Sequence, residues 1–319
     1  MRLRRRLRRE GRVRILASFS FGAQPASGVR ARLRAGLVLA CVGLGACAPS
    51  TPECAVPERV GALPEALREA SGLAASRRHE GVLWTHDDSG GEPEIFAIDT
   101  AGRLLSTVRV TDATFTDWED IEVGPCDVGD CIYIGDIGNN RRDRDSATIF
   151  VIPEPAPTET VSAPARRLRL RYPGGPAADA EALFVLPGPA VYVISKGIEQ
   201  PVTVFRYPGE PRPGVAVELE AVQTLTPEPV ALPDQVTGAG ASPDGDLVAV
   251  RTYTALQLYR PTDGRLSAAL LDSAGIDLTP AAEPQGEGVA LGDGGNVWLV
   301  SERGLDTIAP LSRLRCSGG

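Results

Sequence analysis

The sequence predicts an all-β fold: a β-propeller built from four-stranded antiparallel blades. Glycine and proline are frequent, with 35 and 27 copies in 319 residues, as expected for many short strands joined by tight turns. A pair of short strand-like runs recurs along the chain at intervals of roughly 47 to 62 residues, which is the spacing of propeller blades. The second run of each pair is apolar and ends at a charged residue. A β-sandwich is the competing fold, but it would not explain this repeated charged strand end.

The clearest repeat unit is the stretch Asp117–Arg142. It contains two strand-like runs, Ile121–Val123 and Cys131–Ile134, joined by a turn rich in glycine, proline and aspartate. Glu119 opens the first run and Asp136 closes the second. An antiparallel hairpin places the start of its first strand beside the end of its second, so these two acids should share one edge of the unit.

The other units follow from alignment on this hairpin. First strands are expected at Ser71–Ala75, Trp118–Ile121, Ala180–Leu183, Thr237–Gly240 and Gly286–Val289. Second strands are expected at Val82–Asp87, Cys131–Asp136, Val191–Lys196, Leu247–Arg251 and Val297–Glu302. Third strands are expected at Glu94–Ile98, Thr148–Ile152, Val202–Tyr207 and Leu256–Tyr259, and fourth strands at Leu104–Val110, Arg167–Arg171, Ala216–Val222 and Leu266–Leu271.

The number of blades depends on how the ring closes. Five units favour five blades, and the last unit has a third strand near Leu311–Cys316 before the chain ends. Its fourth strand could come from the N-terminal side, around Arg59–Leu67, which would close the ring. A sixth blade within Val215–Gln235 is the alternative.

The first 46 residues predict export rather than part of the fold. Met1–Arg14 holds eight arginines, and the apolar run Ala35–Ala46 is too short to span a bilayer as a helix. Leu44–Cys47 resembles the lipobox of bacterial lipoproteins, which predicts a lipid on Cys47, with 47–58 as a tether and 59–319 as the propeller domain. Cleavage without a lipid, or before Cys41, is the alternative. We therefore expect a cell-envelope lipoprotein of the outer membrane or periplasm, or a secreted protein.

Charge restricts the partners of the exported part. The leader holds 11 of the 33 basic residues and one of the 41 acidic ones, which leaves 22 basic and 40 acidic residues and a net charge of about −18. Such a charge disfavours nucleic acid and anionic lipid, so membrane contact is expected only through the anchor. A small molecule or an envelope protein is the expected partner, and a monomer is the expected state.

The cysteines are consistent with an oxidising compartment. Without Cys41, and with Cys47 lipidated, an even number remains. Cys126 and Cys131 flank one tight turn and could bridge locally, whereas Cys54 and Cys316 would join the two ends of the domain. A metal cluster is the weaker alternative, because the chain has only two histidines, His79 and His86.

A candidate site follows from the hairpin geometry. The innermost strands of a propeller line its central channel, so charged residues at their starts and at the ends of the second strands should share one face. This face should collect Asp87, Glu119, Asp136, Glu181, Lys196, Arg251, Glu287 and Glu302. Ca²⁺ accepts six to eight oxygen ligands and could bind several of these carboxylates, with Asn139 or Asn140. Alternatively, Lys196 and Arg251 neutralise the ring, bind a ligand, or both.

A catalytic role has one candidate pair. His86 precedes Asp87 at the expected channel face, and either residue could activate water in a calcium-dependent hydrolase. A structural histidine is the alternative. Serine nucleophile elbows, phosphate-cradling loops and paired Cys-x-x-Cys motifs are absent from the sequence.

The motifs DWEDI, YIGDIGNN, DAEAL and GEGVAL resemble an exported bacterial β-propeller family of the TolB-like or NHL-like kind, over essentially residues 60–316. More distantly, GEGVALGDGGNVWLVSERG is similar to blade segments of β-propeller phytases and related esterase-like propellers. The latter resemblance implies calcium held by an inner-strand glutamate and by acids ending the next strand. Glu287 and Glu302 match this pattern and Glu181 matches its first half, but Lys196 stands where the second acid would be. The first hypothesis is thus a non-catalytic binder, and the alternative is a calcium-dependent hydrolase of phosphoesters, lactones or esters.

Overall fold

The computed structural model describes residues 52–317, except 89, 272–274 and 306–307, and these residues belong to one compact unit. The expected signal region 1–46, the lipid site Cys47 and the start of the tether lie outside the described residues. Two short 3-10 helices occur, η1 (Thr279–Ala281) and η2 (Asp293–Gly295). In the described part of the chain, no helix is long and apolar enough to cross a membrane.

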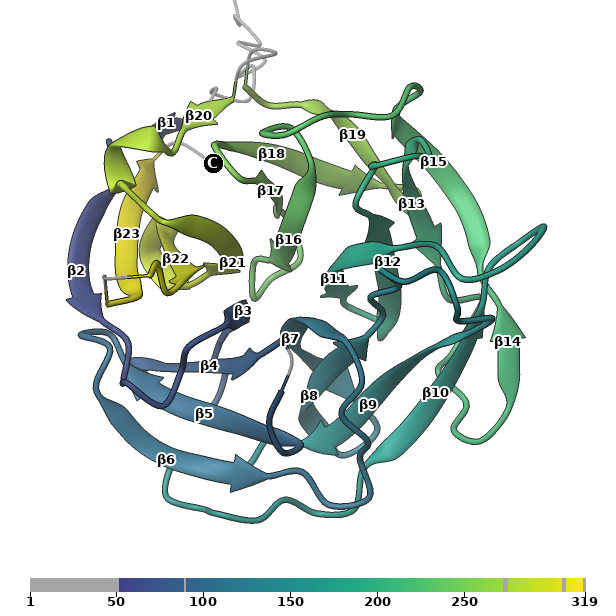
Figure 1. Ribbon diagram of the computed structural model, residues 1–319, viewed down its shortest axis with the longest axis horizontal. Coiled ribbons are helices and arrows are strands. Elements are labelled where there is room, and N and C mark those ends of the chain that lie inside the picture. Colours follow the sequence, from purple (N-terminus) through teal and green to yellow (C-terminus); the bar gives the residue numbers. More distant parts are fainter. Residues whose placement is uncertain (1–51, 89, 272–274, 306–307, 318–319) are drawn as a thin grey trace, which may run out of the picture. The chain divides into compact units, whose positions relative to one another are not determined.

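Five separate sheets surround a common centre, which confirms the β-propeller and its five blades (Figure 1). The first blade has the strand order β3 (Ala70–Ala75), β4 (Val82–Asp87), β5 (Glu94–Asp99) and β6 (Leu104–Arg109). The second has β7 (Trp118–Cys126), β8 (Gly129–Asp136), β9 (Ala147–Pro153) and β10 (Arg166–Arg171). Each first strand lies nearest the centre, as the hairpin repeats predicted.

The third blade corrects one expected strand. It consists of β11 (Ala180–Leu186), β12 (Ala190–Ser195), β13 (Val202–Arg206) and β15 (Glu220–Thr226). The sequence predicted a single fourth strand at Ala216–Val222, but β14 (Ala216–Glu218) leaves this blade and pairs in parallel with β10 of the second. The segment proposed as a sixth blade is thus used by two existing blades.

The last two blades complete the ring. The fourth contains β16 (Val236–Ala241), β17 (Val248–Thr252), β18 (Ala255–Thr262) and β19 (Arg265–Ala269), with β20 (Ile276–Asp277) also paired to β18. The fifth contains β21 (Gln285–Leu291), β22 (Asn296–Glu302) and β23 (Pro310–Ser317). Both β1 (Glu53–Cys54) and β2 (Glu58–Ala62) pair antiparallel with β23. An N-terminal strand therefore joins the C-terminal sheet, slightly earlier in the chain than Arg59–Leu67.

Both predicted disulfides are present. Cys54 is bonded to Cys316 beside the β1–β23 pairing, and Cys126 is bonded to Cys131 across the β7–β8 turn. The first bridge joins positions 262 residues apart and holds the two ends of the described chain in one sheet.

Strand position explains the hydropathy pattern. Inner and second strands are covered on both faces by the next blades, so β11 is buried throughout and β8 is buried from Cys131 to Asp136. Outer strands have one exposed face, and β10 accordingly alternates arginine with buried leucine. The core is divided into five clusters, each formed between two adjacent blades.

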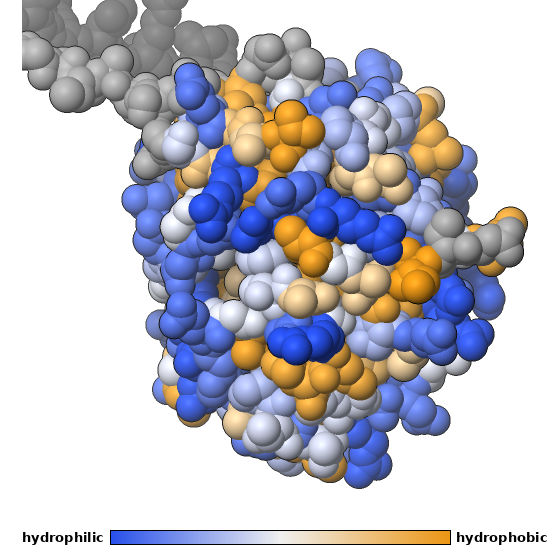
Figure 2. Space-filling model, turned by 90° about the vertical axis from the view of Figure 1, so that its left-hand side faces the viewer, coloured by the Kyte–Doolittle hydropathy of each residue, from blue (hydrophilic) through white to orange (hydrophobic). Residues whose placement is uncertain are grey.

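The inner strands approach one another very closely. A Cβ atom on Gly288 would lie 2.5 Å from the Ser71 carbonyl oxygen, and one on Gly238 would lie 2.7 Å from the Glu287 carbonyl oxygen. No side chain fits at such a distance, which explains the small residues in GEG and TGAGA. The outer surface is different: on the side that carries β2, hydrophobic residues form small groups among hydrophilic ones (Figure 2).

Candidate functional site

A β-bulge at the start of every inner strand shapes the candidate site. The register shifts between Trp118 and Asp120 in β7, between Ala180 and Ala182 in β11, and near the starts of β3, β16 and β21. A bulge re-aims the side chain of its extra residue. Glu119, Glu181 and Glu287 lie within these bulges, so three blades place a glutamate at the same position. We call this end of the ring, where the inner strands begin, the channel mouth.

The carboxyl groups of Glu119 and Glu181 interact with each other at the channel mouth. Both are buried, with 5% and 3% exposure. Burial and the neighbouring charge of Glu181 raise the pKa of Glu119 well above its usual range, and burial also raises the pKa of Glu181. A side-chain hydrogen bond to Glu181 raises the pKa of Glu119 further. Burial and the closeness of the two carboxyl groups therefore disfavour two negative charges on this pair.

Lys196 supplies the positive charge of the channel mouth. Its Nζ lies 2.7 Å from Oε1 of Glu181 in an ion pair that is almost closed to solvent. Burial disfavours the ammonium ion, but the charge of Glu181 and this hydrogen bond outweigh it and raise the pKa of Lys196 above its usual range. The lysine that interrupts the calcium-like pattern is thus a built-in counter-ion for the glutamate pair.

Glu287 is the least satisfied carboxyl group of the site. Its Oε1 accepts a hydrogen bond of 2.8 Å from Nε2 of Gln285, but its Oε2 is buried and has no hydrogen-bond partner. The residue is only 4% exposed. Burial, followed by the charge of Glu181, raises the pKa of Glu287 well above its usual range.

Glu302 and Tyr253 complete the neighbourhood of Glu287. Nε2 of Gln285 also donates to Oε1 of Glu302 at 2.5 Å, and burial together with nearby Glu69 and Glu181 raises the pKa of Glu302 to about 7. Burial, and then the charge of Glu287, raises the pKa of Tyr253. Glu302 therefore shares the Gln285 amide with Glu287, and Tyr253 lies close enough for the charge of Glu287 to raise its pKa.

Other predicted members of this face have partners of their own. Asp87 accepts backbone hydrogen bonds of 3.0 Å from both Arg68 and Glu69. Asp136 is paired with Arg144, at 2.8 Å between Oδ1 and Nη2. Both are near the channel mouth, but each is held in a local structural contact.

Arg251 is held by structural contacts, and its charge lowers the pKa of Glu287, although burial of Glu287 outweighs this effect. Arg251 is fully buried, it pairs with Glu283, and its Nη1 donates to the carbonyl oxygens of Gly288 and Val300 at 2.7 and 3.0 Å. These contacts tie the fourth blade to the fifth. The contacts of Arg251 are thus structural, and its expected role in ligand binding stays a prediction.

The expected asparagine ligands are placed differently from each other. The side chain of Asn139 is buried, donates to the carbonyl oxygen of Ala177 at 2.7 Å and accepts from the backbone of Arg144. Asn140 is exposed, and its backbone N–H donates to Asp117. Asn139 thus fixes a loop, and neither side chain is brought to Glu287 by the contacts of the described residues.

His86 lies inside the protein rather than at an open mouth. It is fully buried and makes an edge contact with Trp118, with ring centroids 5.8 Å apart. Burial lowers the pKa of His86 to about 4. These surroundings fit the alternative hypothesis of a structural histidine, and the catalytic role of His86 stays a prediction.

Two carboxyl groups that sequence reasoning missed fill the channel below the mouth. Oδ2 of Asp120 accepts backbone hydrogen bonds from Leu183 in β11 and Ala239 in β16, at 2.8 and 3.1 Å. Oε2 of Glu122 accepts one from Ala241 at 2.8 Å, and burial raises the pKa of Glu122 to about 8. These acids join three inner strands across the channel. The alternation of acidic and apolar residues after Glu119 is the signal that indicates them.

The carboxyl groups at the channel mouth are poorly arranged to hold a metal ion. Within the residues that the structure describes, no three histidine, cysteine, aspartate or glutamate side chains are grouped so that they could hold one. The unpaired Oε2 of Glu287 could accept a cation, but Glu181 is already neutralised by Lys196. The residues therefore fit a single positive charge at Glu287 better than a calcium ion shared by the three glutamates.

Comparison with known proteins identifies no family for this chain. No family model matches the sequence, and no curated protein matches it. The resemblance to β-propeller phytases is therefore not shown. Three solved propellers are similar in fold. The soluble aldose sugar dehydrogenase of Escherichia coli in its apo form is 9% identical with a TM-score of 0.48, covering 82% of this chain and 99% of that one.

The other two are comparably distant. The PQQ-bound aldose sugar dehydrogenase of Streptomyces coelicolor is 14% identical with a TM-score of 0.46, covering 85% of this chain and 100% of that one. The calcium-binding protein regucalcin of Agrobacterium tumefaciens is 12% identical with a TM-score of 0.44, covering 82% and 96%. Likenesses this weak carry no argument about activity. The function has to be inferred from the channel mouth itself.

Proposed function

We propose that this protein binds a small ligand through an ammonium group at the channel mouth, without catalysing a reaction on it. The observation that carries the proposal is Oε2 of Glu287, a buried carboxyl oxygen without a hydrogen-bond partner. A buried polar atom that lacks a partner is costly, so a ligand that supplies a positively charged donor gains the full benefit of pairing with it.

The surroundings of Glu287 suit an ammonium ion. Lys196 already places one ammonium group on Glu181 at 2.7 Å, which shows that the channel mouth accommodates this kind of pair. Tyr253, whose pKa is raised partly by the charge of Glu287, supplies an aromatic ring nearby. Carboxylates and aromatic rings are the groups with which proteins recognise ammonium ligands.

Proton release should accompany binding. The pKa of Glu287 is raised well above its usual range, mainly by burial and then by Glu181. A cation favours the ionised carboxylate, so its arrival at Oε2 displaces the proton. Binding should therefore strengthen as the pH rises.

Hydrolysis is left out of the proposal because the two predicted catalytic residues are engaged elsewhere. His86 is fully buried against Trp118, and Asp87 caps two backbone amides. For the organism-level role, we propose an exported protein held by a lipid on Cys47. The lipobox-like sequence and the two disulfides support this placement.

Isothermal titration calorimetry on the propeller domain tests the proposal. Spermidine and ethanolamine, whose ammonium groups carry N–H donors, serve as ammonium probes and calcium chloride as the metal probe, each titrated into the wild type, Glu287→Gln and Glu210→Gln. Glu210 is an exposed carboxylate in the β13–β14 loop and is the matched control. The proposal expects an ammonium probe to bind the wild type and the control, and to bind Glu287→Gln at least about tenfold more weakly, which corresponds to 1.4 kcal/mol. Binding of calcium alone, or equal binding by Glu287→Gln, would overturn it.

A further inference from the structure

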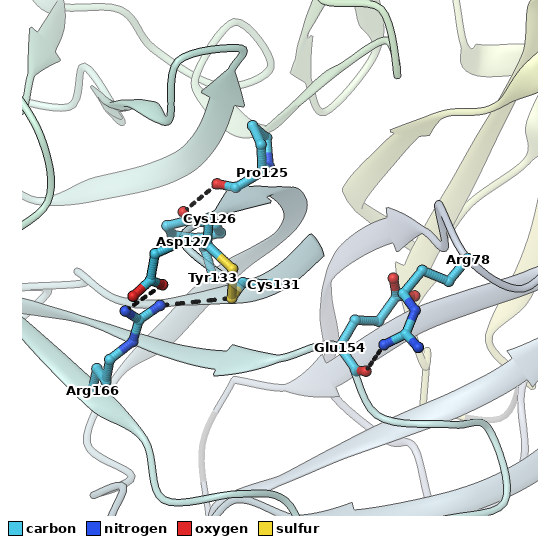
Figure 3. The surroundings of a disulfide bond; sticks show 8 residues. All are labelled: Arg78, Pro125, Cys126, Asp127, Cys131, Tyr133, Glu154 and Arg166. Carbon is cyan, nitrogen blue, oxygen red and sulfur yellow. Dashed lines mark hydrogen bonds and ion pairs between the residues drawn. A yellow bond between two sulfur atoms is a disulfide. The ribbon is translucent and has the colours of Figure 1, made fainter. Parts of the chain in front are cut away.

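The Cys126–Cys131 disulfide lies at the opposite end of β7 from the channel mouth. β7 begins at Trp118 in the mouth and ends at Cys126, and Cys131 follows in β8 after a short turn. Figure 3 shows this bridge beside Arg166, Asp127 and Tyr133. None of these residues belongs to the ammonium site.

The two sulfur atoms have different surroundings. Cys131 is fully buried within the core cluster between the second and third blades. Cys126 is partly exposed and lines a cavity of about 350 Å³. A thiol that enters this cavity can therefore reach Cys126, whereas Cys131 is shielded.

A guanidinium group contacts the shielded sulfur. Nη2 of Arg166 lies 3.7 Å from Sγ of Cys131, and Nη1 of the same side chain pairs with Asp127 at 2.7 Å (Figure 3). Asp127 is well exposed and orients the arginine from the solvent side. A neighbouring cation stabilises a thiolate relative to a thiol, and a better-stabilised thiolate is a better leaving group in disulfide exchange.

We propose that Cys126–Cys131 is a thiol–disulfide exchange site, in which Cys126 accepts an incoming thiol and Arg166 stabilises the departing Cys131 thiolate. An external thiolate attacks Sγ of Cys126 and forms a new S–S bond while the Cys126–Cys131 bond breaks. The bonding electron pair leaves with Cys131, whose thiolate remains beside Arg166. A second external thiolate can then attack the mixed disulfide, which oxidises two thiols to one disulfide and leaves Cys126 and Cys131 reduced.

The cavity indicates a cysteine-containing peptide as the substrate class. Apolar side chains and prolines form most of its walls, among them Val151, Leu168 and Pro211, and the charged residues Arg166, Asp127 and Glu210 also line it. A volume of about 350 Å³ holds a residue or two next to the reacting cysteine, rather than a bulky cofactor. Apolar residues beside the cysteine should be favoured.

The test uses the full propeller domain with its second bridge as an internal reference. Cys316 of the Cys54–Cys316 bridge also lines a cavity, so both bridges offer a partly accessible sulfur. The protein is incubated with reduced glutathione, free thiols are trapped with iodoacetamide, and the sites are mapped by mass spectrometry. The proposal expects Cys126–Cys131 to be reduced at least about tenfold faster, with glutathione found on Cys126. Equal rates for the two bridges, or glutathione mainly on Cys131, would overturn it.

Substitutions separate the role of Arg166 from that of folding. Arg166→Met should slow reduction of Cys126–Cys131 by roughly three- to tenfold, because the leaving thiolate loses its cation. Arg78→Met is the matched control: Arg78 lies on the same side of the molecule and donates to the Glu154 carbonyl oxygen (Figure 3). Asp127→Asn keeps the guanidinium charge but removes its ion-pair partner, and should change the rate less than Arg166→Met does. An unchanged rate in Arg166→Met, with the reference bridge behaving as in wild type, would contradict the assigned role.

Discussion

Replacing Arg251 with methionine should destabilise the propeller strongly. The guanidinium of Arg251 is fully buried, pairs with the 4% exposed side chain of Glu283 and donates to two backbone carbonyl oxygens of the fifth blade. Methionine fills much of the same volume but leaves the Glu283 carboxylate buried without its cation. Breaking a buried pair from one side costs about 3–5 kcal/mol, which is about 6–20 °C in melting temperature for a domain of this size.

Thermal and urea unfolding of the wild type and three variants measures this effect. Arg206→Met is the matched control, because Arg206 and Glu220 form an ion pair whose side chains are 38% and 47% exposed, and its loss should cost less than about 1 kcal/mol. The double variant Arg251→Met with Glu283→Met removes both charges and should be more stable than Arg251→Met alone. A melting temperature for Arg251→Met within about 2 °C of the wild type would refute the assigned role of this arginine.

Three further outcomes are expected. The pKa of Glu302 is raised from 4.5 to about 7 on folding, so its stabilising contribution is present below pH 4.5 and is lost as the pH rises through 7. The wild type should therefore melt at a higher temperature at mildly acidic than at mildly alkaline pH, and Glu302→Gln should reduce this difference. An unchanged pH profile in Glu302→Gln would contradict this role of Glu302. A Cβ on Gly138 would lie 2.0 Å from Oε1 of Glu119, whereas a Cβ on Gly175 would meet open space. Gly138→Ala should therefore lower the melting temperature and weaken amine binding more than Gly175→Ala does. Equal effects of the two substitutions would contradict this packing. Cys54→Ser removes the Cys54–Cys316 disulfide, which closes a loop of 262 residues. Urea titrations should show that the free energy of unfolding falls by about 3–5 kcal/mol. A loss below about 1 kcal/mol would show that strand pairing alone holds the ends of the domain.

The fold could be predicted from the sequence because each blade repeats one hairpin with the same pattern of apolar and charged residues. The apolar second strands and their charged ends marked all five repeats, and the pairing of Cys54 with Cys316 followed from the number of cysteines. The path of β14 was not accessible, because pairing with β10 of another blade leaves no local pattern in three residues.

Only part of the candidate site could be predicted from the sequence. Hairpin geometry brought Glu119, Glu181 and Lys196 together, since these positions recur in the repeats. Gln285 lies two residues before Glu287 but has no repeated counterpart, and the closeness of Tyr253 to Glu287 comes from tertiary structure alone. Arg251 ends a second strand as Lys196 does, but its longer side chain turns into the interface with the fifth blade and finds Glu283.

The central claim is that Oε2 of Glu287 receives the ammonium group of a ligand and loses a proton when it does. Its most direct test is the number of protons released on binding, obtained from calorimetric titrations of spermidine at about pH 7 in two buffers of different ionisation enthalpy. We expect net proton release by the wild type and by Glu210→Gln, and a loss of both binding and release in Glu287→Gln. Binding without proton release, or release that persists in Glu287→Gln, would contradict it.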